Sequence, residues 1–364
     1  MNLSITSRLG VAAVALLAGV GLAVSSGAAT AATATANTPQ STTHGTASVA
    51  YAGSLELWAA TDLGPKFEAA TGDGFQGRAA GSGTLASEIL ANEISPGVFM
   101  SVGKKNIKRL WPNRSKFAIQ LATDPLVVAY NPQSKFAPQF NAIADHKVPF
   151  ASLFTLLSSP GIRVGRTDPN ADPQGVYFIF MMELAQSTLH LSFDPATTVL
   201  GVSKSTPFGL PAQMVDEDSL ITDLQAGEFD VTSAYLTQAI QYHLHYITLP
   251  QSLNFGVPAD LSNYEKVSIT LAGGSVDQGD LITLNITLVL PANTKRAPSP
   301  ADQAADDAFV AWIVSGAGRA QLKKGGYPLT PPVYIGATPA DTAATTLPAN
   351  VLSAFTASGG TTSS

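Results

Sequence analysis

The stretch from Gly165 to Tyr177, GRTDPNADPQGVY, constrains the fold of this chain more than any other. A residue before proline is biased away from the α conformation. Asp as an N-cap, followed by Pro at the first helical position, marks a helix start. Asp172-Pro173 therefore predicts a helix through residues 176–186, and the apolar segment 161–165 predicts a strand before it. The free N–H groups at such a helix start can hold an anion.

Composition narrows the class of protein. The 364 residues carry a formal net charge of −6, which argues against nucleic acid or an anionic membrane surface as a partner. The chain has no cysteine, so disulfides, thiolate catalysis, zinc–thiolate sites and lipid attachment through a cysteine are excluded.

Both ends of the chain differ in composition from its body. Residues 1–36 combine one early basic residue, Arg8, an apolar run over 10–24 and a series of small residues, which indicates a cleaved secretory signal peptide. The alternative is a membrane anchor, for which a run of about 15 residues is short. We expect a polar linker over 37–46, a loosely held low-complexity tail over 337–364, and a protein secreted to the bacterial cell envelope.

Within the body, predicted strands alternate with predicted helices, which is typical of an α/β fold with parallel sheets. A strand, a Gly-Ser turn and a helix follow one another over residues 47–71 and again over 74–94. Ligands of such sheets bind at the carboxyl ends of the strands, near helix N-termini. The turns Gly53-Ser54 and Gly81-Ser82-Gly83 each offer a hydroxyl and backbone N–H groups to an oxyanion. The alternative is that they are ordinary helix caps.

The sequence contains little evidence for a metal site or a catalytic site. Asp168, Asn170 and Asp172 alternate as in a calcium loop, but Pro173 and Ile179 stand where that loop needs Gly and Glu. We therefore expect no metal site.

The run Asp216-Glu-Asp218 indicates a solvated acidic face before a helix. His243 and His245 could chelate a metal, but no nearby carboxylate completes a set. No pair of carboxylates suits general acid–base catalysis, so we expect no catalytic residues, no cofactor and no enzyme activity.

Several segments resemble extracellular solute-binding proteins of ABC importers, of the molybdate/tungstate-binding type. The resemblance runs in order over most of residues 47–335. Its most specific motif is Gly165–Gly175, and the others are Tyr51–Leu55, Gly64–Gly72, Ala80–Gly83, Phe309–Ala320 and Gly326–Leu329.

The resemblance implies a two-lobed, type 2 periplasmic-binding-protein-like α/β fold with the ligand cleft between the lobes. Lobe 1 would comprise residues 47–124 and 251–336, and lobe 2 residues 125–250. The chain would cross between the lobes within Phe117–Tyr130 and Tyr246–Phe255. The implied partners are a small oxyanion and an ABC importer permease, with the protein itself a monomer. The ligand-binding residues carried over are Ser54, Ser82, Gly83, Asp172, Gly175, Tyr177 and Tyr235.

Three departures from the family pattern bear on the ligand. Gly97 stands where the family often has Asp, Val176 follows Gly175 where Tyr is common, and Ala234 stands where tungstate binders have a second carboxylate. Without that carboxylate a six-coordinate metal oxyanion is harder to bind. This departure favours a four-coordinate oxyanion or another kind of ligand. The first hypothesis is a secreted binding protein for a small oxyanion of the molybdate/tungstate class. The alternative is a secreted sensor or interaction protein on the same fold with an altered cleft.

Overall fold

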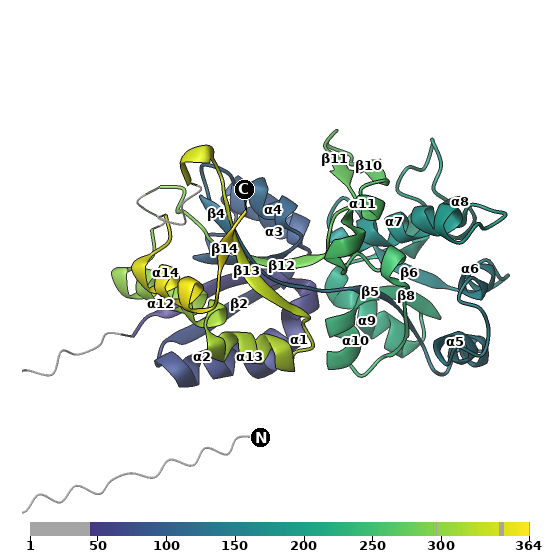
Figure 1. The fold of residues 1–364 in the computed structure, drawn as a ribbon, viewed down its shortest axis with the longest axis horizontal. Coiled ribbons are helices and arrows are strands. Elements are labelled where there is room, and N and C mark those ends of the chain that lie inside the picture. The colour runs from purple at the N-terminus through teal and green to yellow at the C-terminus, as the bar shows by residue number, and fades with distance from the viewer. Residues whose placement is uncertain (1–43, 294, 296, 342–345, 364) are drawn as a thin grey trace, which may run out of the picture. The chain divides into compact units, whose positions relative to one another are not determined.

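The computed structural model describes residues 44–293, 295, 297–341 and 346–363 (Figure 1). The predicted signal peptide and most of the predicted linker lie outside the described residues. Residues 43–364 group into one compact unit. Within its described part, no helix is long and apolar enough to cross a membrane.

Lobe 1 is built on a seven-stranded sheet with the order β14-β13-β4-β12-β3-β1-β2. Strand β1 pairs in parallel with β2 and β3, whereas β12 pairs antiparallel with both β3 and β4. The carboxyl ends of β1, β2 and β3 therefore share one edge of the sheet. The strands are β1 Thr46–Ala52, β2 Gly74–Ala80, β3 Val98–Val102, β4 Phe117–Thr123, β12 Thr283–Leu288, β13 Leu329–Gly336 and β14 Thr361–Thr362.

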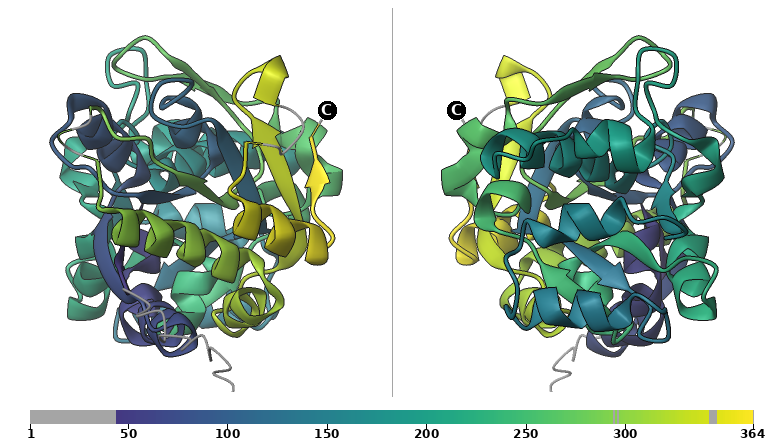
Figure 2. Two further views of the ribbon diagram at one scale, coloured as in Figure 1. Left: turned by 90° about the vertical axis from the view of Figure 1, so that its left-hand side faces the viewer. Right: turned by 90° about the vertical axis from the view of Figure 1, so that its right-hand side faces the viewer.

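The helices of lobe 1 include short turns at the strand ends and longer helices that cover the sheet. Helix α12 packs on β1, β12 and α14, and α12 and α14 lie side by side in the left view of Figure 2. The elements are η1 Gly53–Leu55, α1 Glu56–Trp58, the π-helix η2 Ala59–Leu63, α2 Gly64–Thr71, α3 Ser82–Ala91, α4 Lys104–Lys108, α12 Pro300–Val314, α13 Gly316–Lys324, η7 Pro339–Asp341 and α14 Ala349–Ala357.

Lobe 2 is built on a five-stranded sheet with the order β7-β6-β8-β5-β9. Its strands are β5 Leu126–Tyr130, β6 Val164–Thr167, β7 Met214–Val215, β8 Val231–Tyr235 and β9 His245–Thr248. Its other elements are α5 Ala137–Ala144, α6 Ser152–Leu157, α7 Pro173–Thr188, α8 Pro195–Leu200, η3 Pro211–Gln213, α9 Glu217–Ala226, α10 Leu236–Gln241, η4 Gln251–Leu253, η5 Pro258–Asp260 and α11 Leu261–Tyr264. The predicted helix after Asp172-Pro173 is confirmed as α7, which is buried along most of its length.

The chain passes between the two sheets twice. The first passage is at Asp124-Pro125, between β4 and β5. The second lies near Ile282, just before β12, and the expectation of a crossing within Tyr246–Phe255 is wrong. The reason is that the segment after β9 stays on lobe 2, where Phe255 packs on Tyr177 with ring centroids 5.2 Å apart.

The segment between the two sheets also forms a hairpin that the sequence did not predict. The apolar segments 267–271 and 282–290 predict two strands that pair with each other. Instead β10, Ser268–Thr270, pairs antiparallel with β11, Val276–Gln278, while β12 joins the sheet of lobe 1.

The C-terminal segment is packed where it is described, so the expectation of a loosely held tail is wrong there. Val351 and Phe355 of α14 are buried in the main hydrophobic cluster, and the Phe355 ring lies 6.4 Å from that of Tyr334. Strand β14 then pairs in parallel with β13. One short apolar run in a polar stretch is thus enough to dock this segment.

Candidate anion site

Two turns at the carboxyl ends of β1 and β2 place serines at the edge of lobe 1. Ser54, in η1, is buried, and its hydroxyl lies near enough to Glu217 to lower the pKa of that carboxyl group, against the larger effect of burial. Ser82 begins α3, and its buried hydroxyl accepts a hydrogen bond from the Val102 backbone N–H at 3.2 Å. The strand–turn–helix units predicted here are both present.

The second turn touches lobe 2 directly, and its glycines make this approach possible. The Thr84 N–H donates to the Ala171 carbonyl at 3.2 Å. A Cβ placed on Gly83 would lie 2.6 Å from that carbonyl oxygen, and one on Gly81 would lie 2.9 Å from it. Only glycine at these positions lets the two backbones come this close.

From lobe 2, Asp172 caps α7, as the sequence predicted. Its Oδ1 accepts from the Gln174 N–H at 2.9 Å and from the Thr167 hydroxyl at 2.8 Å. The carboxyl group is almost fully buried. The backbone of Ser82 is also near enough to favour the ionised form, which places Asp172 against the lobe 1 turn.

A second carboxyl group, that of Glu217, completes the contact between the lobes. Glu217 begins α9 in lobe 2, and its side chain reaches η1 of lobe 1. Its Oε2 accepts from the Gly53 N–H at 3.0 Å and its Oε1 from the Ser54 N–H at 2.9 Å. The prediction of a solvated acidic face at residues 216–218 is therefore wrong for Glu217, which is 4% exposed.

Burial and proximity alter the titration of these two acids. Burial, with the charge of Asp172 as the second cause, raises the pKa of Glu217 well above its usual range. Burial likewise raises the pKa of Asp172, against the lowering effect of its hydrogen bonds. The described residues place no Lys or Arg in an ion pair with either acid. This environment therefore disfavours two negative charges at once.

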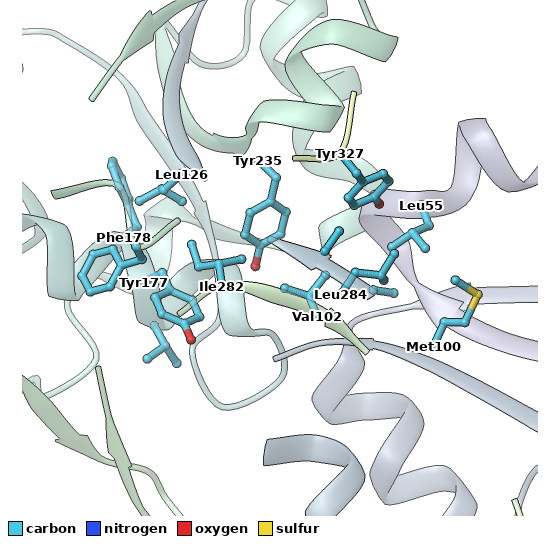
Figure 3. Packing of buried hydrophobic residues seen from close by; sticks show 14 of the residues in the cluster. Leu55, Met100, Val102, Leu126, Tyr177, Phe178, Tyr235, Ile282, Leu284 and Tyr327 are labelled. Atoms are coloured by element: carbon cyan, nitrogen blue, oxygen red, sulfur yellow. The ribbon is translucent and has the colours of Figure 1, made fainter. Parts of the chain in front are cut away.

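Tyr235 lies at the end of β8, where α10 begins. Its ring is fully buried, and its hydroxyl has no partner among the described residues. Figure 3 shows this hydroxyl directed toward Ile282 at the second crossing. Burial and the charges of Asp172 and Glu217 raise the pKa of Tyr235 well above its usual value, so the phenol remains a neutral donor.

The two other predicted residues on α7 differ in what they contact. The Tyr177 hydroxyl donates to the Leu281 carbonyl at 3.4 Å, next to the second crossing. Gly175 packs on the end of β6, because a Cβ there would lie 2.3 Å from the Thr167 carbonyl oxygen. Gly175 thus brings α7 close to β6.

Cavities flank Asp172 on both sides. One of about 370 Å³ is lined by α4, the loop before α7 and the tip of the β10–β11 hairpin, and Val176 is in its wall. The other, of about 290 Å³, is lined by the α3 turn and by residues 215–218. Asp172 lines both cavities, and Glu217 lines the second one.

The structure shows what surrounds Gly97 and Ala234, two of the positions that depart from the family pattern. Gly97 precedes β3 at the end of the sheet opposite the serine turns, and a Cβ there would lie 1.7 Å from the Asp306 Oδ2. The carboxyl group of Asp306, from α12, occupies this space instead. Ala234 is buried in β8, and the carboxyl group of Glu217, from another element, lies near that of Asp172. The sequence alone did not place these two carboxyl groups together.

Fold and site together define a two-lobed α/β binding protein with neutral donors and two carboxyl groups between its lobes. Residues 47–328 match the family described as bacterial extracellular solute-binding protein. The chain belongs to this family, which confirms the predicted class of binding protein rather than enzyme.

Relatives and solved structures are similar to this chain to different extents. A solute-binding protein of Methanococcus aeolicus is 26% identical over 291 residues, covering 73% of this chain and 80% of the relative. The molybdate/tungstate-binding protein WtpA of Pyrococcus abyssi is 27% identical over 245 residues, covering 63% and 67%. The solved periplasmic molybdate-binding protein of Azotobacter vinelandii gives a TM-score of 0.49 at 17% identity, covering 78% of this chain and 99% of that one.

Proposed function

We propose that the protein binds a metal oxyanion, molybdate or tungstate, between its lobes and delivers it to an ABC importer. The observation that carries the proposal is the meeting of Asp172 and Glu217 beside the Gly53–Ser54 and Ser82 turns. The donors that face this point are hydroxyls and backbone N–H groups. Such donors are preorganised and hold an oxyanion without a full cation.

The carboxyl pair favours a metal oxyanion over sulfate. A buried carboxylate in this pair repels a dianion that stays tetrahedral. Mo(VI) and W(VI) can accept further oxygen ligands, whereas the sulfur of sulfate cannot. Asp172 and Glu217 would then act as oxygen donors to the metal of the cargo, while the hydroxyls of Ser54 and Ser82 donate to its oxo groups.

The relatives support the same ligand class. The similar protein of Pyrococcus abyssi is named for molybdate and tungstate. A relative in Haloferax volcanii, 27% identical over 266 residues, bears the provisional name of an ABC transporter molybdenum-binding protein. The alternative of a sensor with an altered cleft loses one of its three supports, because the proposed pair takes its second carboxyl group from Glu217 and not from position 234.

Isothermal titration of the purified, ligand-free protein with molybdate, tungstate, sulfate and phosphate tests the proposal. We expect molybdate and tungstate to bind at least about 100-fold more tightly than sulfate, or roughly 2.7 kcal/mol. A folded protein that binds none of the four, or that binds sulfate equally well, contradicts the proposed ligand class. Delivery is tested by molybdate uptake in cells that lack this protein, which should fall and recover on complementation.

A further inference from the structure

The β10–β11 hairpin is an extension of lobe 2. The Ala272 N–H at its tip donates to the Asn170 Oδ1 at 2.9 Å, in the loop that leads to Asp172. At its base the Gly279 N–H donates to the Val267 carbonyl at 2.9 Å. The hairpin is therefore fixed to the same lobe as Asp172.

Its far side is held by helix α4 of lobe 1. The Lys105 Nζ lies 2.7 Å from the Asp277 Oδ1 and donates to the Val276 carbonyl at 2.7 Å. The Lys104 Nζ lies 2.8 Å from the Asp280 Oδ2. Both ion pairs join the two lobes, and all four side chains are partly exposed.

This contact is close to the anion site. Helix α4 follows β3, whose last residue, Val102, donates to the Ser82 hydroxyl. The hairpin tip and α4 also form opposite walls of the cavity beside Asp172. Separation of the lobes would move Lys104 and Lys105 away from their partners and open this cavity.

We propose that Lys104, Lys105, Asp277 and Asp280 form a latch that positions the closed lobes and sets how long the ligand is retained. The inference rests on the proposed function. Because the ion pairs form only as the lobes meet, they act on the dissociation rate and not on the first encounter. Partly exposed pairs each contribute little, so about a threefold effect per pair is expected.

Stopped-flow kinetics of molybdate binding to the full chain test the latch. We expect Asp277→Asn and Asp280→Asn each to raise the dissociation rate about threefold and the double variant about tenfold, with the association rate unchanged within about twofold. Both substitutions keep the side-chain shape. The amide oxygen that Asp280→Asn introduces can still accept from the Leu281 N–H, as the Asp280 Oδ1 does at 2.8 Å. Exchanging the charges in Lys105→Asp with Asp277→Lys should restore most of the wild-type rate, which a merely structural role would not do.

The matched control is Asp62→Asn. Asp62 pairs with Lys324 at 3.0 Å, and both belong to lobe 1, so its loss should leave the dissociation rate unchanged. The latch also predicts that the difference between wild type and the double variant shrinks as salt rises, because salt screens exposed charges.

The possible outcomes separate the two proposals. An unchanged dissociation rate in the double variant overturns the latch while molybdate binding stands. If the wild type binds no oxyanion, the proposed function fails and the latch is judged by hydrogen exchange in the ligand-free protein. The double variant should then exchange faster in residues 268–278 and 104–108, and equal exchange overturns the latch.

Discussion

At the scale of single residues, the proposed site assigns the choice of anion to the carboxyl groups of Asp172 and Glu217. Glu217→Gln keeps an acceptor for one of the two N–H donors at Gly53 and Ser54 but removes an oxygen donor for the metal. We expect molybdate affinity to fall at least about tenfold, or roughly 1.4 kcal/mol, and the preference over sulfate to narrow. Titration calorimetry measures both, and Glu228→Gln, an exposed acid of the same lobe, is the control. If Glu217→Gln kept the wild-type preference for molybdate over sulfate, Glu217 would not contact the ligand.

A third buried acid, Asp124, lies at the first crossing and supports a prediction about stability. Its carboxyl group accepts from the Thr237 N–H at 3.1 Å and from the Thr237 hydroxyl at 2.5 Å. Burial raises the pKa of Asp124 to about 7. Between its ordinary pKa in the unfolded chain and this value, the native state holds a proton that the unfolded state has lost. The free energy of unfolding therefore falls as pH rises through this window and levels off above it.

Asp124→Asn removes this penalty, since an amide does not titrate and can still accept from the N–H and donate to the hydroxyl. We expect the variant to gain on the order of 2–4 kcal/mol over wild type at pH 8 and little at pH 4. Urea unfolding at the two pH values gives the comparison. A gain that is the same at both pH values would show that Asp124 does not titrate as inferred.

The sequence predicted most residues of the proposed site but not Glu217. Ser54, Ser82 and Asp172 follow strands and start helices, which local patterns reveal. Glu217 also follows a strand and starts a helix. Because two acidic residues flank it, however, the segment was predicted to be exposed to solvent. Its burial depends on η1 of the other lobe, where its partner Gly53 is 164 positions away, and no local pattern encodes that contact. The signal available was its place at a strand-to-helix turn, the same place as in the three residues that were found.

At the scale of elements, the start of α3 requires glycine for contact with lobe 2. In Gly83→Ala the new Cβ would meet the Ala171 carbonyl oxygen at 2.6 Å, and a backbone atom cannot move aside. We expect molybdate affinity to fall about tenfold or more while the melting temperature of the ligand-free protein hardly changes, because alanine favours a helix. Gly316→Ala in α13, where nothing lies within 4 Å of the new Cβ, is the matched control. Wild-type affinity in Gly83→Ala would show that the lobes close differently.

Element types were easier to predict than their partners. The alternation of strands and helices, and the start of α7, follow from local signals. Local signals do not reveal the pairing of β12 or the position of the second crossing. Both depend on which lobe the segment between β9 and β12 packs against. The ring of Phe255 lies 4.7 Å from that of Tyr264 and 5.2 Å from that of Tyr177. This aromatic packing holds the segment on lobe 2, and sequence periodicity carries no sign of it.

At the scale of the whole molecule, a ligand between the lobes should make them unfold together. The proposed site takes Ser54 and Ser82 from one lobe and Asp172 and Glu217 from the other. Molybdate at about 100 times its Kd should add roughly 2.7 kcal/mol to the unfolding free energy and raise Tm by about 4 °C. Differential scanning calorimetry should show the whole heat-absorption peak moving with molybdate and a smaller shift with sulfate. If only part of the peak moved, the ligand would be held by one lobe alone, and the proposed site between the lobes would be wrong.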